Sequence, residues 1–148
     1  MTRQNTDTEN VLMRKKIICL LTLLLLATGV GAQTLRNSNY STLGSIDTNG
    51  TIRNSNNSTV GRIEGNGDIR DSNNRYLGRI ESNGDIRNQQ NSYVGKVESN
   101  GTVRNSSNST LGKVESDGTV RDSNYRTIGY AKGVPATYAA VFFFFKFF

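Results

Sequence analysis

The chain has 148 residues, of which 34% are hydrophobic, and it carries a formal net charge of +6 with one cysteine and no histidine. This length suits one domain with a modest core, and the lack of histidine removes the most common metal ligand and general base. From residue 33 onward basic side chains exceed acidic ones by four and alternate with them at a fixed spacing, which argues against a nucleic-acid partner.

The first predicted element is a secretory signal peptide over residues 1–32. A basic cluster, Arg14 to Lys16, precedes an apolar run from Ile17 to Ala27, and small residues follow before Gln33. The run has 11 residues, whereas a membrane-spanning helix needs about 20, so we expect cleavage and no transmembrane span in the mature chain. Export then leads to the periplasm, the cell envelope or the extracellular space. Met13, just ahead of the basic cluster, is a more natural start than the first methionine.

Residues 33–133 form a repeat domain with a unit of 17 residues. Five consecutive copies fill residues 42–126, and the fragments 34–41 and 127–131 together make up a sixth. Complementary end fragments indicate that the first and last strands meet. Each copy holds two short apolar segments between clusters of Gly, Asn, Asp and Ser, which predicts two β-strands per unit. The expected fold class is all-β: a closed radial antiparallel meander of five to six two-strand units.

Both connections in the unit fit three-residue hairpin loops. In one copy, Glu81-Ser82-Asn83-Gly84 fits a type I turn followed by a glycine with positive φ, and this register places Ile80 opposite Ile86. The preceding loop, residues 71–74, has the same form with an asparagine in place of the glycine, because asparagine tolerates positive φ. The two registers agree with a continuous antiparallel meander.

The apolar residues share one face only if the strand bulges. The hairpin register pairs Ile69 with Leu77, yet Leu77 and Ile80 have opposite parity in a regular strand. A bulge at Gly78 resolves this conflict, and the same bulge in every unit would bend all strand pairs alike. Repeated bending favours closure, which also removes exposed sheet edges; an open solenoid with capped ends is the alternative.

Residues 134–148 predict a Phe-rich helix that belongs to the same domain and fills its centre. Pro135 suits a first helical turn, and a segment that is apolar on nearly every side is typical of a buried helix. A ring of 12 strands would be roughly 18–22 Å across, which is wide enough for a helix. We expect the core to include Phe142, Phe143, Phe144, Phe145, Phe147 and Phe148. Alternatively the tail anchors the protein peripherally or docks onto a partner, or Phe148 ends an outer-membrane barrel, for which four-residue strands are too short.

The sequence resembles a known family in three of its features together. Repeats such as TVGRIEGNGDIRDSNNR and the closing segment TIGYAKGVPATYAAVFFFF resemble those of five-fold β-flower proteins, which are exported proteins of Bacteroidetes-like bacteria. The resemblance covers residues 34–148 and implies a radial β arrangement with the C-terminal segment at its centre, without implying an activity. The family name says five where the chain has six unit equivalents, so either the symmetry is six-fold or one unit is not a petal.

One arginine per unit forms a ladder that we expect on the outer surface: Arg36, Arg53, Arg70, Arg87, Arg104 and Arg121. The ladder could form an anion-binding rim. Cross-strand pairing, for example Arg87 with Glu81 and Arg79 with Asp85, explains it more simply, together with packing of arginine stems on Tyr76 or Tyr93.

Acidic residues offer no stronger site. The turn residues match no calcium-binding motif, and turn chemistry explains them. The acid pairs Glu64/Asp68 and Glu81/Asp85 could suggest a glycosidase, but they occur in two copies and would lie on an open rim. We therefore predict no catalytic residue, cofactor or metal.

The expected function is that of an exported, non-catalytic structural or binding module of the bacterial cell envelope, with a glycan or another envelope component as the candidate partner. The alternative is a periplasmic glycan-acting hydrolase. An enzyme should break the repeat with polar residues that occur once, and the copies show little such asymmetry.

Overall fold

The structure is a computed structural model that describes residues 31–148, so the predicted signal peptide lies almost entirely outside the described residues. Its elements are short strands followed by one helix. In chain order they are β1 (Gln33–Asn37), β2 (Thr42–Ile46), β3 (Thr51–Asn54), β4 (Thr59–Ile63), β5 (Asp68–Asp71), β6 (Tyr76–Ile80), β7 (Asp85–Asn88), β8 (Tyr93–Val97), β9 (Thr102–Asn105), β10 (Thr110–Val114), β11 (Thr119–Asp122), β12 (Thr127–Tyr130) and α2 (Ala136–Phe143).

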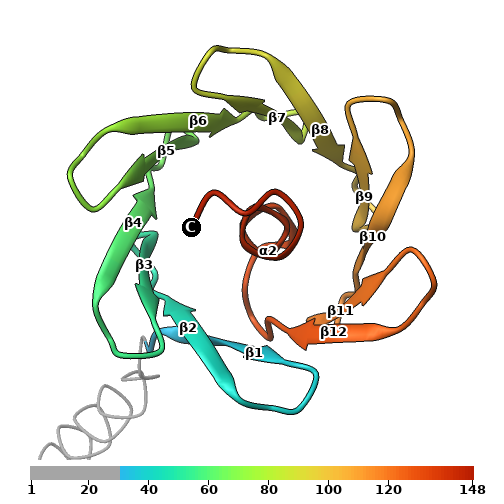
Figure 1. The fold of residues 1–148 in the computed structure, drawn as a ribbon, viewed down its shortest axis with the longest axis horizontal. Helices are drawn as coiled ribbons and strands as arrows, with labels where there is room; N and C mark the ends of the chain where they lie inside the picture. Colours follow the sequence, from blue (N-terminus) through green and yellow to red (C-terminus); the bar gives the residue numbers. More distant parts are fainter. Residues whose placement is uncertain (1–30) are drawn as a thin grey trace, which may run out of the picture. The chain divides into compact units, whose positions relative to one another are not determined.

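The strands form a closed antiparallel barrel, as the repeat predicted. Each strand pairs with its neighbour in the chain, and β1 pairs with β12 to close the ring. Figure 1 shows six hairpins around a central helix, from β1–β2 to β11–β12. The expected range of five to six units therefore resolves to six, and the unit assembled from the two end fragments contributes strands like the others.

Both predicted loop types are confirmed. The backbone N–H of Gly84 donates to the Glu81 carbonyl at 2.9 Å, and Gly84 has a φ of 86°. In the second loop type Asn74 takes the glycine's place with a φ of 66°. Ile80 lies opposite Ile86, as expected. The two loop types thus repeat the same geometry at alternate ends of the barrel.

The left-handed asparagines allow a direct test of stability. Asn91 has a φ of 60°, a conformation that costs alanine more than asparagine because the short polar side chain of asparagine can hydrogen-bond locally and offset the clash of the Cβ. We expect Asn91→Ala to lower the free energy of unfolding by about 1 kcal/mol and Asn91→Gly to leave it within about 0.5 kcal/mol. Urea unfolding followed by circular dichroism measures both. Equal stability of the alanine and glycine variants would contradict the assigned backbone conformation.

A bulge occurs in every unit, but the register beside it differs from the prediction. Ile69 lies opposite Gly78, not Leu77, and the pairing shifts between Ile69 and Arg70. Leu77 is therefore the extra residue of the bulge, and it packs half-buried against the core. Pairing residues outward from a hairpin turn assumes equal numbers of residues on the two strands. The bulge inserts one extra residue in one strand, so the predicted partner is displaced by one position.

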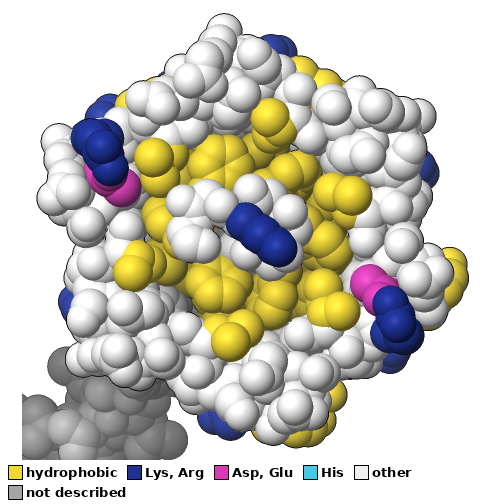
Figure 2. All heavy atoms as spheres, in the orientation of Figure 1, with side chains coloured by type: hydrophobic (Ala, Val, Ile, Leu, Met, Phe, Trp, Pro, Cys, Tyr) yellow, Lys and Arg dark blue, Asp and Glu magenta, His cyan; other side chains and the backbone are white. Residues whose placement is uncertain are grey.

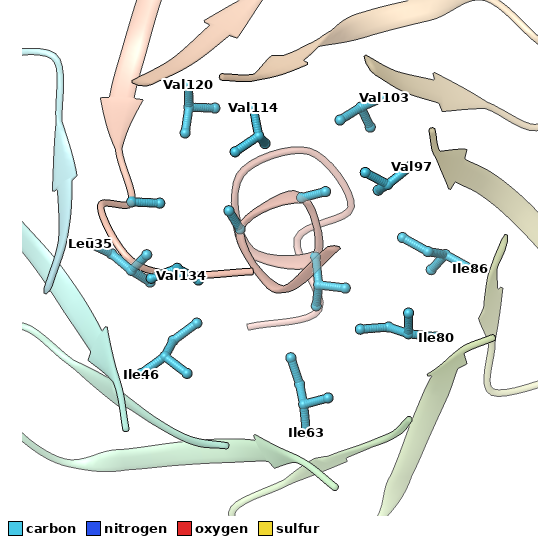
Figure 3. Packing of buried hydrophobic residues seen from close by; sticks show 14 of the residues in the cluster. Leu35, Ile46, Ile63, Ile80, Ile86, Val97, Val103, Val114, Val120 and Val134 are labelled. Carbon is cyan, nitrogen blue, oxygen red and sulfur yellow. The ribbon is translucent and has the colours of Figure 1, made fainter. Parts of the chain in front are cut away.

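The core consists of inward aliphatic side chains around the helix (Figure 3). Ile69, Ile86 and Val103 are fully buried, as are Ala139, Ala140 and Val141 of α2. Among the described residues no polar or charged side chain is buried. The helix thus supplies the small side chains that let it fit inside the ring of larger ones.

The helix is shorter than predicted, because α2 ends at Phe143 instead of continuing to Phe148. From the last residue of the helix onward, five phenylalanine rings pack against the inward glycines of successive hairpins. These pairs are Phe143 with Gly129, Phe144 with Gly112, Phe145 with Gly95, Phe147 with Gly78, and Phe148 with Gly61. Neighbouring glycines are one sixth of a turn apart, whereas an α-helix rotates by more than a quarter turn per residue. Only a non-helical chain can match them in order.

Candidate functional site

The arginine ladder serves the wall of the barrel. Arg87 Nε donates to Glu81 Oε1 at 2.7 Å, as predicted, and Arg70 lies over the ring of Tyr76 at 6.0 Å. Arg87 Nη1 also donates to the carbonyl of Asn91 at 3.2 Å. The guanidinium groups thus connect strands to loops, and nothing in this geometry singles out an anion-binding rim.

One predicted pair is wrong. Arg79 does not pair with Asp85; its Nε lies 2.9 Å from Asp68 Oδ1, and Asp85 pairs instead with Lys96 at 3.4 Å. The register explains the difference, because Arg79 lies directly opposite Asp68 on one side and opposite Arg87 on the other. Directly opposite side chains are closer than diagonal ones.

The acid pairs are bound in ion pairs. Glu64 lies 2.6 Å from Arg62 and 3.3 Å from Arg70, and Asp68 lies 3.5 Å from Arg70. Hydrogen bonding from Arg62 holds the pKa of Glu64 below its usual value, against a smaller desolvation effect. A glycosidase acid needs a raised pKa, and the pKa of Glu64 is shifted in the opposite direction.

The turn residues cap their own loops. Asp71 Oδ1 accepts the backbone N–H groups of Asn73 and Arg75, both at 2.9 Å, and the other units repeat the arrangement. Within residues 31–148 no group of three or more acidic, cysteine or histidine side chains is placed to hold a metal. The same part of the chain contains no helix long and apolar enough to cross a membrane.

The site that departs from the repeat lies at the seam, where β1 pairs with β12. A surface depression of about 780 Å³ opens there across β1, β12 and β11. We call it the seam groove, and its lining residues are Thr34, Arg36, Tyr40, Asp117, Thr119, Tyr130 and Lys132.

Two stacked tyrosines form one wall of the seam groove. The rings of Tyr40 and Tyr130 lie 4.4 Å apart and are tilted by 13°. At the equivalent place in another unit, Arg62 Nη2 donates to the side-chain oxygen of Asn74 at 3.0 Å. The seam thus replaces a polar contact by an aromatic pair. Tyr40 is 60% exposed, so the outer face of its ring is open to a ligand.

Tyr40 also occupies a strained backbone position. Its φ is 62°, at a position where four units carry asparagine. A bulky residue in this region costs of order 1 kcal/mol more than asparagine. Tyr125 shares the conformation with a φ of 62° in the neighbouring loop, but there the equivalent partner is Lys113. The strain at Tyr40 is thus combined with an aromatic stack that Tyr125 lacks.

The charge of the seam groove is reversed at one position. Lys132 stands where the other units have an acid, namely Asp47, Glu64, Glu81, Glu98 and Glu115. In those units the acid typically pairs with the ladder arginine, as Glu98 does with Arg104 at 2.6 Å. Among the described residues no carboxylate lies within ion-pair distance of Arg36 or Lys132. The groove therefore offers two cations without a carboxylate partner, although Arg36 Nη1 donates to the backbone carbonyl of Tyr40 at 3.2 Å.

The other ionisable groups of the seam groove, Asp117 and Tyr130, do not cancel the positive charge of Arg36 and Lys132. The backbone N–H of Thr119 donates to Asp117 Oδ1 at 2.8 Å and is the main cause that lowers the pKa of Asp117, so one carboxylate stays ionised. Hydrogen bonding with the Tyr40 hydroxyl, followed by desolvation, raises the pKa of Tyr130, so the phenol stays neutral. At neutral pH the groove carries a net positive charge.

Sequence analysis missed this groove, although the signal was present. The closing fragment TIGYAK puts Tyr130 and Lys132 at positions where the other copies have short polar or basic residues and acids, respectively. As members of a sixth copy they look like ordinary residues of the repeat, and only comparison with the same position in the other five copies shows the change. A second depression of about 540 Å³ lies where the tail enters the barrel; its one acid, Glu115, pairs with Lys113 at 2.7 Å.

Six hairpins closed into a ring around the chain's own C-terminal segment define a radial, repeat-built β-protein whose seam departs from the repeat. The chain belongs to the 5-fold beta-flower protein family, whose model matches residues 32–147. The six hairpins exceed the number in the family's description. No curated protein and no solved structure matches the chain.

Proposed function

We propose that the protein is an exported, non-catalytic binding module of the bacterial cell envelope whose seam groove binds an acidic glycan. The observation that carries the proposal is the change of residues at one of six equivalent positions: Tyr40, Tyr130 and Lys132 replace the residues of the repeat. A repeat built only for structure would have no reason to change these three together. Export rests on the predicted signal peptide.

The chemistry of the seam groove favours a sugar that bears a carboxylate. The exposed face of the Tyr40 ring can pack against the C–H face of a pyranose, as aromatic side chains bury one apolar face and leave a polar edge free. Arg36 and Lys132 can pair with a carboxylate, and the arginine can do so with two hydrogen bonds. The hydroxyls of Thr34 and Thr119 can bond sugar hydroxyls.

The carboxylates support a non-catalytic role over the glycan-hydrolase alternative. Hydrolysis needs two acids of different pKa, one of them raised, on either side of the bond. The seam groove holds one acid, Asp117, whose pKa is lowered, and the pairs elsewhere are neutralised by arginine or lysine. A lowered pKa suits an ion pair and opposes proton donation.

Calorimetry with the mature chain purified after export tests the proposal, with tetragalacturonate as the acidic probe and maltotetraose as the neutral one. We expect the acidic tetrasaccharide to bind and the neutral one to bind at least tenfold more weakly. Tyr40→Asn and Lys132→Glu should each weaken acidic binding about tenfold, equivalent to about 1.4 kcal/mol. Both changes restore residues that other units carry, so the fold should persist.

The matched control is Tyr125→Asn, which relieves the same backbone strain in the adjacent loop without touching the stack. We expect it to bind the probe like the unaltered protein. Equal binding of the acidic and neutral tetrasaccharides, or unchanged affinity of Tyr40→Asn, would show that the seam groove is not an acidic-glycan site. Turnover of the tetrasaccharide, seen as reducing ends, would favour the hydrolase.

A further inference from the structure

One end of the barrel is an apolar face with a charge at its middle. The tail rings lie against glycines near the start of the even-numbered strands, whereas the helix begins beside the opposite loops, where Ala136 lines a depression with Gly84. The tail therefore faces the end that carries loops 37–41, 54–58, 71–75, 88–92, 105–109 and 122–126. We call this end the tail face. Figure 2 shows it as a broad apolar surface.

Two sets of half-buried side chains make up the tail face. The first set is the extra residue of each bulge: Leu43, Val60, Leu77, Val94, Leu111 and Ile128. The second set is the phenylalanines of the tail, all half-buried, which form the floor. A continuous exposed apolar surface on a small protein marks a place of contact with something else.

Lys146 is the one charged residue of the tail, and it is exposed. Figure 2 shows a basic side chain near the middle of the apolar surface, where the tail ends. No carboxylate of the described residues lies within ion-pair distance of Lys146. Lys146 has a φ of 51°. The phenylalanines on either side of it in the chain, Phe145 and Phe147, pack on the glycines of neighbouring hairpins, so Lys146 itself occupies no glycine contact.

The charges of the barrel are divided between its ends. The loops opposite the tail face begin with, or contain, the acids Asp47, Glu64, Glu81, Glu98, Glu115 and Asp117. The loops at the tail face contain two acids, Asp71 and Asp122, and each pairs with an arginine of its own loop, Arg75 at 2.6 Å and Arg126 at 2.9 Å. With Lys146 added, the tail face is apolar and carries one unpaired positive charge, whereas most acids of the other end pair with arginines and lysines of the strands.

We propose that the tail face docks on the surface of an anionic lipid bilayer. Binding at a bilayer interface requires apolar side chains that enter the boundary of the acyl chains and a cation that pairs with a lipid phosphate. The tail face offers both. The loops that contain the six acids then point away from the negative surface. A second copy fits less well, because two tail faces in contact would bring one Lys146 against another.

Flotation with vesicles of phosphatidylglycerol and phosphatidylcholine tests the proposal on the mature chain, with pure phosphatidylcholine as the neutral surface. We expect binding to the anionic vesicles that falls as salt rises. Lys146→Glu should weaken it at least about fivefold, since a basic residue near an anionic surface is worth about 1 kcal/mol. Val60→Thr with Val94→Thr should weaken it as well, while keeping the shape of both side chains.

Lys132→Glu is the matched control, because it makes the same charge change beside the opposite loops and should leave vesicle binding within about twofold. Conversely, Lys146→Glu should leave tetragalacturonate binding unchanged, so failure of one proposal does not imply failure of the other. Equal binding of Lys146→Glu and the unaltered protein would overturn the lipid proposal. So would a dimer in sedimentation that the two threonine substitutions dissociate, since the tail face would then be an interface between copies.

Discussion

Removing residues 134–148 will leave a chain that does not fold into a barrel. The tail supplies Val134, Ala139, Ala140 and Val141 of the buried core and the phenylalanine rings that pack on five glycines. Each large apolar side chain contributes on the order of 2–3 kcal/mol, so the loss exceeds the total stability of a domain of this size. Circular dichroism and size-exclusion chromatography should show an unfolded or aggregated product.

Removing one phenylalanine ring instead of the whole tail gives a smaller, measurable loss of stability. Phe145→Ala removes one ring from Gly95 and should lower the free energy of unfolding by about 3 kcal/mol. The matched control is Tyr125→Ala, because Tyr125 is 77% exposed and lies outside the core. A soluble truncated chain with unchanged stability would refute the tail as the core of the barrel.

Gly112→Ala will strongly destabilise the barrel. A Cβ at Gly112 would lie 2.7 Å from the ring of Phe144 and would also meet the carbonyl oxygen of Arg121. Because both obstacles are fixed by the barrel, we expect a loss of about 2–3 kcal/mol and a melting temperature lower by about 10 °C. Thermal unfolding followed by circular dichroism measures the effect.

Gly65→Ala is the control for this substitution. It lies in a hairpin loop, where a Cβ would meet nothing within 4 Å, and its φ is not in the left-handed region. We expect its stability to equal that of the unaltered protein or to exceed it slightly. If Gly112→Ala melted at the same temperature as Gly65→Ala, the close packing of ring on glycine would be wrong.

The sequence predicted the features that depend on neighbouring residues. Gly84 and Asn74 identify the two loops, because glycine and asparagine accept a positive φ at the lowest cost, and the loop length then sets the pairing of Ile80 with Ile86. Closure followed from the complementary end fragments. These predictions succeed because local backbone geometry leaves few solutions.

Features that depend on the whole ring could not be predicted in the same way. The end of α2 at Phe143 depends on the angle between hairpins, which no single repeat contains. The pairing of Arg79 with Asp68 depends on the residue that the bulge adds. The seam groove depends on contact between Tyr40 and Tyr130, ninety positions apart in the chain, and only closure brings them together.

The junction of β1 with β12 also has a consequence for the order of synthesis. The five internal copies are synthesised before the closing strand, and each can form its hairpin locally. Without the closed ring and the tail, however, their apolar side chains have nothing to pack against. The partner of β1 and the phenylalanines emerge last. Until then the nascent chain is an open sheet with two unpaired edge strands and an exposed apolar face. The last twenty or so residues therefore determine when the protein can fold completely.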